Sequence, residues 1–150
     1  MPISSVFNRL ACTALIGLSG LAACTELPST GAQADFYAPR TQARVYALDA
    51  RSFEVVPQIG ANGASYWCTA ADFARRRLGA GWSQMIYVQK GRADSVVSGR
   101  IDAVTFTLDE IPRAEGYPLI RRAYGFKPGD AFSLSTAEGF CHEVEPLLFF

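Results

Sequence analysis

Hydrophobic positions follow helical spacing along one long stretch of the chain, residues 64–78. Within it, Trp67, Ala71, Ala74 and Leu78 stand at i, i+4, i+7 and i+11, which places them in one continuous stripe on an α-helix. Alanines on such a stripe allow a helix to lie close to a sheet. The pattern predicts an amphipathic helix with a buried face.

The residues at both ends of this stretch are typical of helix termini. Asn62 or Ser65 can cap the first turn, and Gly79 can adopt the left-handed conformation that ends a helix. Three arginines, residues 75–77, occupy the last turn, where positive charge favours the helix dipole. We expect them to be a solvated charged surface, with Asp72 paired along the helix.

Shorter segments rich in β-formers predict strands. Polar and apolar residues alternate best in residues 103–108, where Val104, Phe106 and Leu108 share one face. The expected strands are residues 44–48 and 52–56, which form a hairpin, then 84–89, 103–108, 119–124, 131–135 and 140–144. We therefore predict an α+β fold in which one amphipathic helix packs on an antiparallel sheet of about five or six strands.

The N-terminus has the pattern of an export signal. Arg9 precedes a mostly apolar run over residues 10–21, which is the length of a signal-peptide core and too short to span a bilayer. The run leads into Leu21-Ala22-Ala23-Cys24.

This tetrapeptide resembles the lipobox of bacterial lipoproteins. The resemblance implies transfer of diacylglycerol to the Cys24 thiol, cleavage before Cys24 and acylation of the new N-terminus. Thr25 follows, whereas Asp at that position resembles an inner-membrane retention signal. We therefore expect a lipid-anchored envelope protein at the outer membrane, facing the periplasm. An ordinary secretory signal is the alternative, but the Ala-x-Ala site before Asp35 lies far beyond the apolar run.

Composition divides the chain into three parts. Residues 1–23 form the expected signal peptide, and residues 24–40, rich in small and polar residues and proline, form a lipidated flexible tether. Residues 41–150 form a single α+β domain, since 150 residues in all leave room for one core. The 14 basic and 14 acidic side chains balance, which excludes the electrostatic footprint of a nucleic-acid-binding protein.

The cysteines left after processing are Cys68 and Cys141, an even number in an oxidising compartment. We predict a disulfide between them, from the helix to the last strand of the sheet. The alternative is a thiol enzyme with Cys141 as nucleophile and His142 as base. Neighbouring strand residues point to opposite faces, which disfavours that pair.

Other candidates for chemistry are sparse. His142 is the single histidine and makes a poor zinc site alone. The acidic pairs Asp109-Glu110 and Glu143 with Glu145 are expected at the solvated surface, and Trp82 lies in a loop where it could stack on a sugar. We expect no metal and no cofactor.

A second resemblance concerns the mature chain. Residues Tyr66-Trp67-Cys68, Leu78-Gly79 and Ile86-Tyr87, with the late Cys141, resemble small secreted proteins of alphaproteobacteria. The resemblance implies no activity. We therefore expect a non-enzymatic binding, assembly or structural role, with the membrane as one partner and an envelope protein or glycan as another. The alternatives are the thiol enzyme and an inhibitor or glycan-binding module acting on envelope components.

Overall fold

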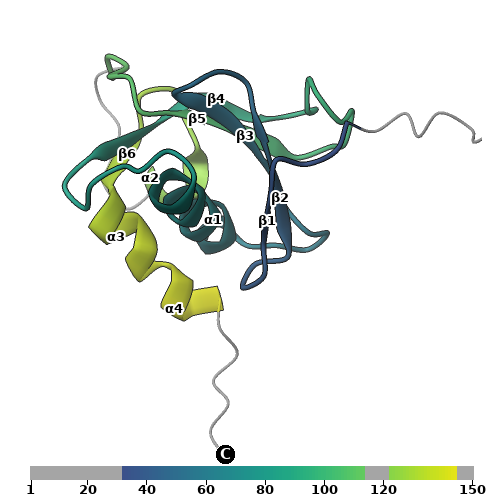
Figure 1. Cartoon of the computed structure of the whole chain (residues 1–150), viewed down its shortest axis with the longest axis horizontal. Coiled ribbons are helices and arrows are strands. Elements are labelled where there is room, and N and C mark those ends of the chain that lie inside the picture. Colours follow the sequence, from purple (N-terminus) through teal and green to yellow (C-terminus); the bar gives the residue numbers. More distant parts are fainter. Residues whose placement is uncertain (1–31, 114–121, 145–150) are drawn as a thin grey trace, which may run out of the picture.

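The computed structural model describes residues 32–113 and 122–144. Figure 1 shows a twisted sheet on one side of a central helix and short helices on its other side. The strands are β1 (Phe36–Ala38), β2 (Ala43–Ala47), β3 (Ser52–Val56), β4 (Met85–Ala93), β5 (Ala103–Thr107) and β6 (Ala131–Ser133). The helices are α1 (Gly63–Arg76), α2 (Arg122–Gly125), α3 (Leu134–Gly139) and α4 (Cys141–Val144).

The six strands form one sheet in the order β1-β2-β3-β5-β4-β6, with every neighbouring pair antiparallel. The α+β class and the antiparallel sheet are thus confirmed. The predicted hairpin is β2 and β3, and its partners include Val45 opposite Val55. This register places Val45, Phe53 and Val55 on the face that carries α1.

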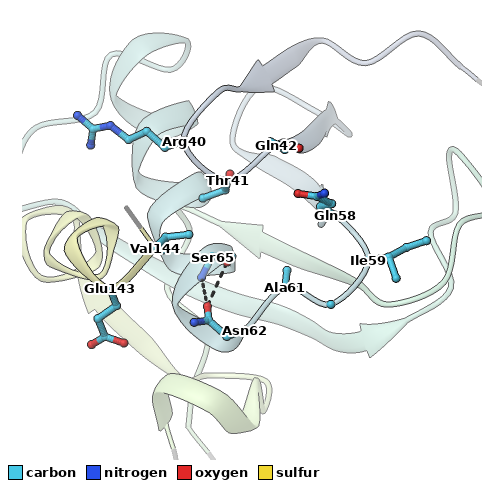
Figure 2. A pocket seen from close by; sticks show the side chains of 11 residues that line it. Arg40, Thr41, Gln42, Gln58, Ile59, Ala61, Asn62, Ser65, Glu143 and Val144 are labelled. Atoms are coloured by element: carbon cyan, nitrogen blue, oxygen red, sulfur yellow. Dashed lines mark hydrogen bonds between the residues drawn. The ribbon is translucent and has the colours of Figure 1, made fainter. Parts of the chain in front are cut away.

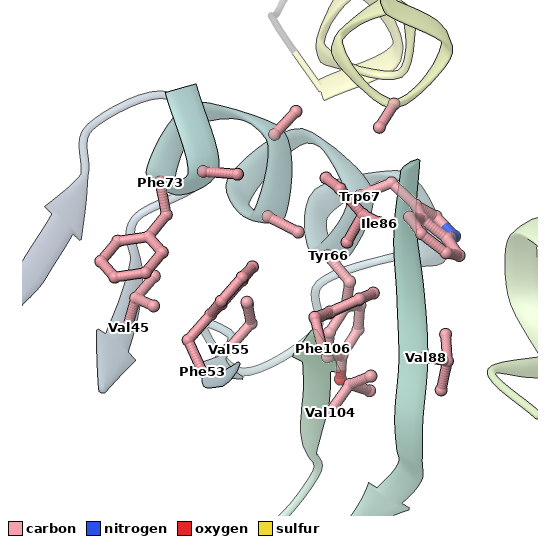
Figure 3. Packing of buried hydrophobic residues seen from close by; sticks show 14 of the residues in the cluster. Val45, Phe53, Val55, Tyr66, Trp67, Phe73, Ile86, Val88, Val104 and Phe106 are labelled. Atoms are coloured by element: carbon pink, nitrogen blue, oxygen red, sulfur yellow. The ribbon is translucent and has the colours of Figure 1, made fainter. Parts of the chain in front are cut away.

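The core lies between that face of the sheet and α1 (Figure 3). Trp67 of α1 is fully buried, and its ring packs 5.1 Å from Phe106 of β5 and 4.8 Å from Phe132 of β6, measured between ring centroids. Phe53 of β3 lies 4.7 Å from Phe73 of α1 in the same way. Trp67 of the predicted stripe and Phe73 beside it are therefore both in contact with the sheet.

Helix α1 is buried on its other side as well. Every residue from Gly63 to Ala74 is buried, because α3 and α4 pack on the side that the sheet leaves open. Asn62 caps the helix by accepting a hydrogen bond from the Ser65 amide at 3.1 Å. Gly79, just beyond the end, has a φ of 66°, as expected for a left-handed stop.

Of the last two predicted strands, 131–135 is confirmed over three residues, and 140–144 is wrong. Residues 131–133 form β6, but residues 134–139 form α3 and residues 141–144 form α4. The Ser133 hydroxyl accepts a hydrogen bond from the Thr136 amide at 3.2 Å and so begins α3. Cys141 therefore lies on a helix, and the link is from α1 to α4.

Two further boundaries differ from the predictions. Strand β1 lies within the segment assigned to the tether and pairs with β2, so the sheet begins before residue 41. Strand β4 extends past residue 89 to Ala93, through shifts of register against β5. The predicted strand 119–124 lies partly outside the described residues, and its described end belongs to α2.

Candidate functional site

Cys68 and Cys141 form the predicted disulfide. Their Cα atoms are 4.8 Å apart, within the range that a disulfide requires. Both residues are 1% exposed. The bond fastens α4 to the side of α1 that faces away from the sheet. Neither sulfur is a thiol in this state, so the pair is a structural cross-link.

His142 follows the cross-link on α4 and is exposed. Glu143, its neighbour, is also exposed and accepts a hydrogen bond from the Tyr124 hydroxyl at 3.1 Å. This bond raises the pKa of Tyr124 above its usual value. The structure thus gives Glu143 a partner on α2, while Glu145 lies outside the described residues.

A polar cleft of about 390 Å³ opens beside α4 (Figure 2). Its walls come from the turn after β1, the loop after β3, the start of α1 and the end of α4. The lining residues are Arg40, Thr41, Gln42, Gln58, Ile59, Gly60, Ala61, Asn62, Ser65, Glu143 and Val144. Five of these eleven residues carry polar, uncharged side chains, which suits a ligand that offers hydroxyl or amide groups.

Several polar side chains at the cleft are held by neighbouring residues. Asn62 Oδ1 accepts hydrogen bonds from both the amide and the hydroxyl of Ser65, each at 3.1 Å. Thr41 and Thr69 share a buried hydroxyl–hydroxyl bond of 2.6 Å. Arg40 reaches Glu138 of α3 at 2.9 Å. The cleft is therefore largely pre-formed, as ligand sites usually are.

The arginines of α1 have structural partners. Arg76 pairs with Asp72 one turn earlier, as predicted. Arg75 donates to the Ala80 carbonyl at 2.9 Å and lies over the Trp82 ring at 4.1 Å from its centroid. Trp82 is 51% exposed, so its free face remains open to solvent. The Arg75 contact leaves one side of the indole for stacking.

The other acidic pair predicted from the sequence, Asp109 and Glu110, lies at the surface. Asp109 is exposed and pairs with Arg51 at the β2–β3 turn, and Glu110 is exposed beside it. Among the described residues, no group of three or more His, Cys, Asp or Glu side chains could hold a metal ion. In the same part of the chain, no helix has the length and apolarity needed to cross a membrane.

Sequence reasoning missed a buried carboxylate on the far face of the sheet. Glu54 of β3 is 1% exposed and accepts a 2.6 Å bond from the Ser95 hydroxyl and a 3.1 Å bond from the Val96 amide. Ser95 Oγ also accepts a bond from the Ser98 amide at 2.9 Å. Because buried carboxylates need such partners, Glu54 fixes the β4–β5 connection over this face.

Tyr66 is the other buried polar anchor near this connection. Its hydroxyl donates to the Asp102 carbonyl at 2.8 Å, and Arg92 lies 4.9 Å from its ring centroid. Burial raises the pKa of this hydroxyl well above its usual value. The group is therefore a permanent hydrogen-bond donor at neutral pH.

Comparison of the chain with protein-family models, with curated proteins and with solved structures gives no match.

Proposed function

We propose that this protein is a lipid-anchored protein of the bacterial cell envelope with a non-enzymatic binding, assembly or structural role. The observation that carries the proposal is Leu21-Ala22-Ala23-Cys24 at the end of an apolar run. Cys24 holds the acyl chains, and Thr25 favours the outer membrane, facing the periplasm. Two or three acyl chains meet the requirement for stable anchoring.

The cross-link between α1 and α4 supports export of the domain. Disulfides form and persist in oxidising compartments such as the periplasm, and are rare in the cytosol. Both sulfurs are buried in the packed interior, so the bond is part of the fold. The thiol enzyme with Cys141 as nucleophile loses its support, because the Cys141 sulfur is bonded to Cys68.

The polar cleft supports a binding role. Its volume of about 390 Å³ lies within the range of small-ligand sites. Walls of amide and hydroxyl groups match the sugar hydroxyls of a glycan or the main chain of an envelope protein. An envelope protein or glycan is therefore the partner class that we propose.

Replacement of Cys24 by Ser tests the anchor. Serine cannot form the thioether, so Cys24→Ser should take up no labelled palmitate and should accumulate as an uncleaved precursor. Cys12→Ser is the matched control, since Cys12 lies inside the expected signal, and it should be labelled like the wild type. Palmitate entering the Cys24→Ser protein would contradict the lipobox.

Capture from envelope membranes tests the binding role. The half-buried Ala61 lines the cleft, so Ala61→Arg should block it, while Ser135→Arg on the exposed face of α3 should not. We expect a partner that the wild type and Ser135→Arg retain and that Ala61→Arg loses. If all three proteins capture the same partner equally, the cleft is not the binding site.

A further inference from the structure

Three apolar side chains project from the loops at one end of the sheet. Ile59 is 88% exposed, Ile101 is 75% exposed and Val96 is 68% exposed, more than any other large hydrophobic side chain in the described part of the chain. Ile59 and Ile101 line the same cleft of about 370 Å³, together with Pro57 and Arg100. We call Ile59, Val96 and Ile101 the apolar rim.

The apolar rim is held in place by the fold. Val96 follows Ser95, which Glu54 binds from inside the domain. The connection closes on itself, since the Ser95 amide donates to the Arg100 carbonyl at 2.8 Å. Asp102, two residues after Arg100, is held by the hydrogen bond that its carbonyl accepts from the Tyr66 hydroxyl. Exposed apolar groups on a rigid support mark an interaction surface better than groups on a free tail.

The chain from Cys24 enters the domain beside this rim. Ala34 and Val97 pack against the same small cluster of Tyr46, Val56 and Ala103. In Figure 1 the first described residues run beside the connection between β4 and β5. From Cys24 to Ala34 the chain can span at most about 35 Å. An acyl chain on Cys24 therefore limits the distance between Ala34 and the bilayer surface to about 35 Å.

The charged side chains nearby fit a bilayer surface. Arg44 and Arg100 line an adjoining cleft of about 250 Å³ whose other lining residues are uncharged. Asp94 is the exposed acid on the connection, and Asp102 pairs with Arg92 at 3.5 Å. Arginines beside exposed isoleucines can reach lipid phosphates while the apolar side chains enter the interface.

From these observations we propose that the apolar rim inserts into the lipid surface that holds Cys24. This inference rests on the proposed lipid anchor. The partner of the rim is the bilayer interface, and the domain lies against the membrane with the apolar rim facing the lipid. The polar cleft shares the loop of Gln58, Ile59 and Gly60 with the rim cleft, so it opens close to the membrane surface.

Quenching by brominated lipid tests the orientation. The acylated full-length product is placed in vesicles of phosphatidylethanolamine and phosphatidylglycerol that contain acyl-brominated phosphatidylcholine. Ile101→Trp places a reporter on the rim. The native Trp82 is the internal control, because it precedes β4 and lies at the opposite end of the β4–β5 pair.

The emission of the reporter should fall roughly twofold, since interfacial side chains reach about 5–10 Å into the bilayer. Wild-type emission should change little, and Val96→Trp should behave like Ile101→Trp. An acylated protein that floats with the vesicles but has an unquenched reporter would overturn the inference and leave the anchor intact. If the reporter is blue-shifted but unquenched and the protein is a dimer, the rim packs against a second copy of the chain. That result would also overturn the inference. A protein that carries no lipid by mass and does not float would overturn both proposals.

Discussion

Trp67 and Trp82 have opposite environments in this domain. Trp67 is fully buried among Phe106, Phe126 and Phe132. Trp82 is half exposed and is covered on one side by Arg75. Replacing the first should leave a cavity in the core, whereas replacing the second removes a surface contact.

We expect Trp67→Ala to lower the free energy of unfolding by about 3–5 kcal/mol, as for large aromatic residues truncated in cores. Trp82→Ala is the matched control and should cost at most about 1 kcal/mol, the size of an exposed cation–π contact. Urea unfolding followed by circular dichroism measures both without relying on tryptophan emission. A loss below roughly 1 kcal/mol for Trp67→Ala would contradict the core role.

Tyr66 makes stability depend on alkaline pH. Its pKa is raised in the folded state above an unfolded value of about 10, so the unfolded chain releases this proton first. The stabilisation is present below about pH 10 and is lost as the pH rises further, by roughly 1.4 kcal/mol for each pH unit. Tyr66→Phe should have a lower free energy of unfolding near neutral pH and a flatter decline above pH 10.

Unfolding of both proteins between pH 8 and about 11 measures the two slopes. Tyr124→Phe is the control, since that hydroxyl is at the surface. Its profile should follow the wild type more closely than that of Tyr66→Phe. Parallel profiles for Tyr66→Phe and the wild type would assign the alkaline loss to other groups.

At the scale of single residues, the sequence could predict that Trp67 is buried and that the two cysteines pair, but it could not predict hydrogen-bond partners far apart in the chain. Trp67 belonged to the predicted stripe, and the two cysteines were paired by compartment and number; both predictions are confirmed. Glu54 could not be identified as buried, because its partner Ser95 lies 41 residues away. Nothing near Glu54 in the sequence distinguishes it from a solvated carboxylate on a strand.

Among the elements, predictions held where the pattern was long or the strand pairing was local, and failed for the two short helices after β6. The stretch of α1 covers several turns, and β2 with β3 forms a local hairpin. Helices α3 and α4 span six and four residues, and runs of that length fit strand and helix patterns equally. Their packing on the open side of α1, which is a tertiary effect, decides between the two.

Glycine at position 91 allows β4 to lie against the segment after α2. A Cβ built on Gly91 would stand 2.5 Å from the Phe126 carbonyl oxygen, a backbone atom. The Phe126 ring is part of the core and packs on Tyr66 at 4.9 Å. Any side chain at 91 would therefore push two elements apart.

We predict that Gly91→Ala costs about 1–3 kcal/mol, as for overpacked sites. Gly81→Ala is the control, since nothing lies within 4 Å of its added Cβ, and it should stay within about 0.5 kcal/mol of the wild type. Thermal unfolding of the two variants gives the comparison. Equal effects would show that the close approach to Phe126 does not govern the cost at position 91.

At the scale of the whole molecule, the domain has three layers. The sheet covers one side of α1, and α3 with α4 covers the other. The sheet face, with its aromatic residues, supplies most of the apolar contact. The second face of α1 includes Cys68, so the disulfide fastens the layer formed by the short helices α3 and α4. Because short helices are marginal without tertiary support, the role of the cross-link is to hold α4 against α1.

This arrangement predicts a large effect of reduction. The ring between Cys68 and Cys141 has a sequence separation of 73, for which loop-closure entropy gives about 4 kcal/mol. In a domain of this size that corresponds to a melting point lower by about 15 °C. Calorimetry of the acylated protein with and without reductant measures the shift. A shift of only a few degrees would mean that α4 stays docked without the bond.

Cysteine variants separate the cross-link from packing. Cys68→Ala and Cys141→Ala each remove the whole bond, so each should lose nearly as much stability as the double variant. Both sulfurs are buried, so reductant reaches the bond only when the chain opens. Reduction of the wild type should therefore accelerate in urea in step with unfolding. If reduction proceeds at one rate with and without urea, α4 opens locally, and the bond then stabilises that helix alone and not the three layers together.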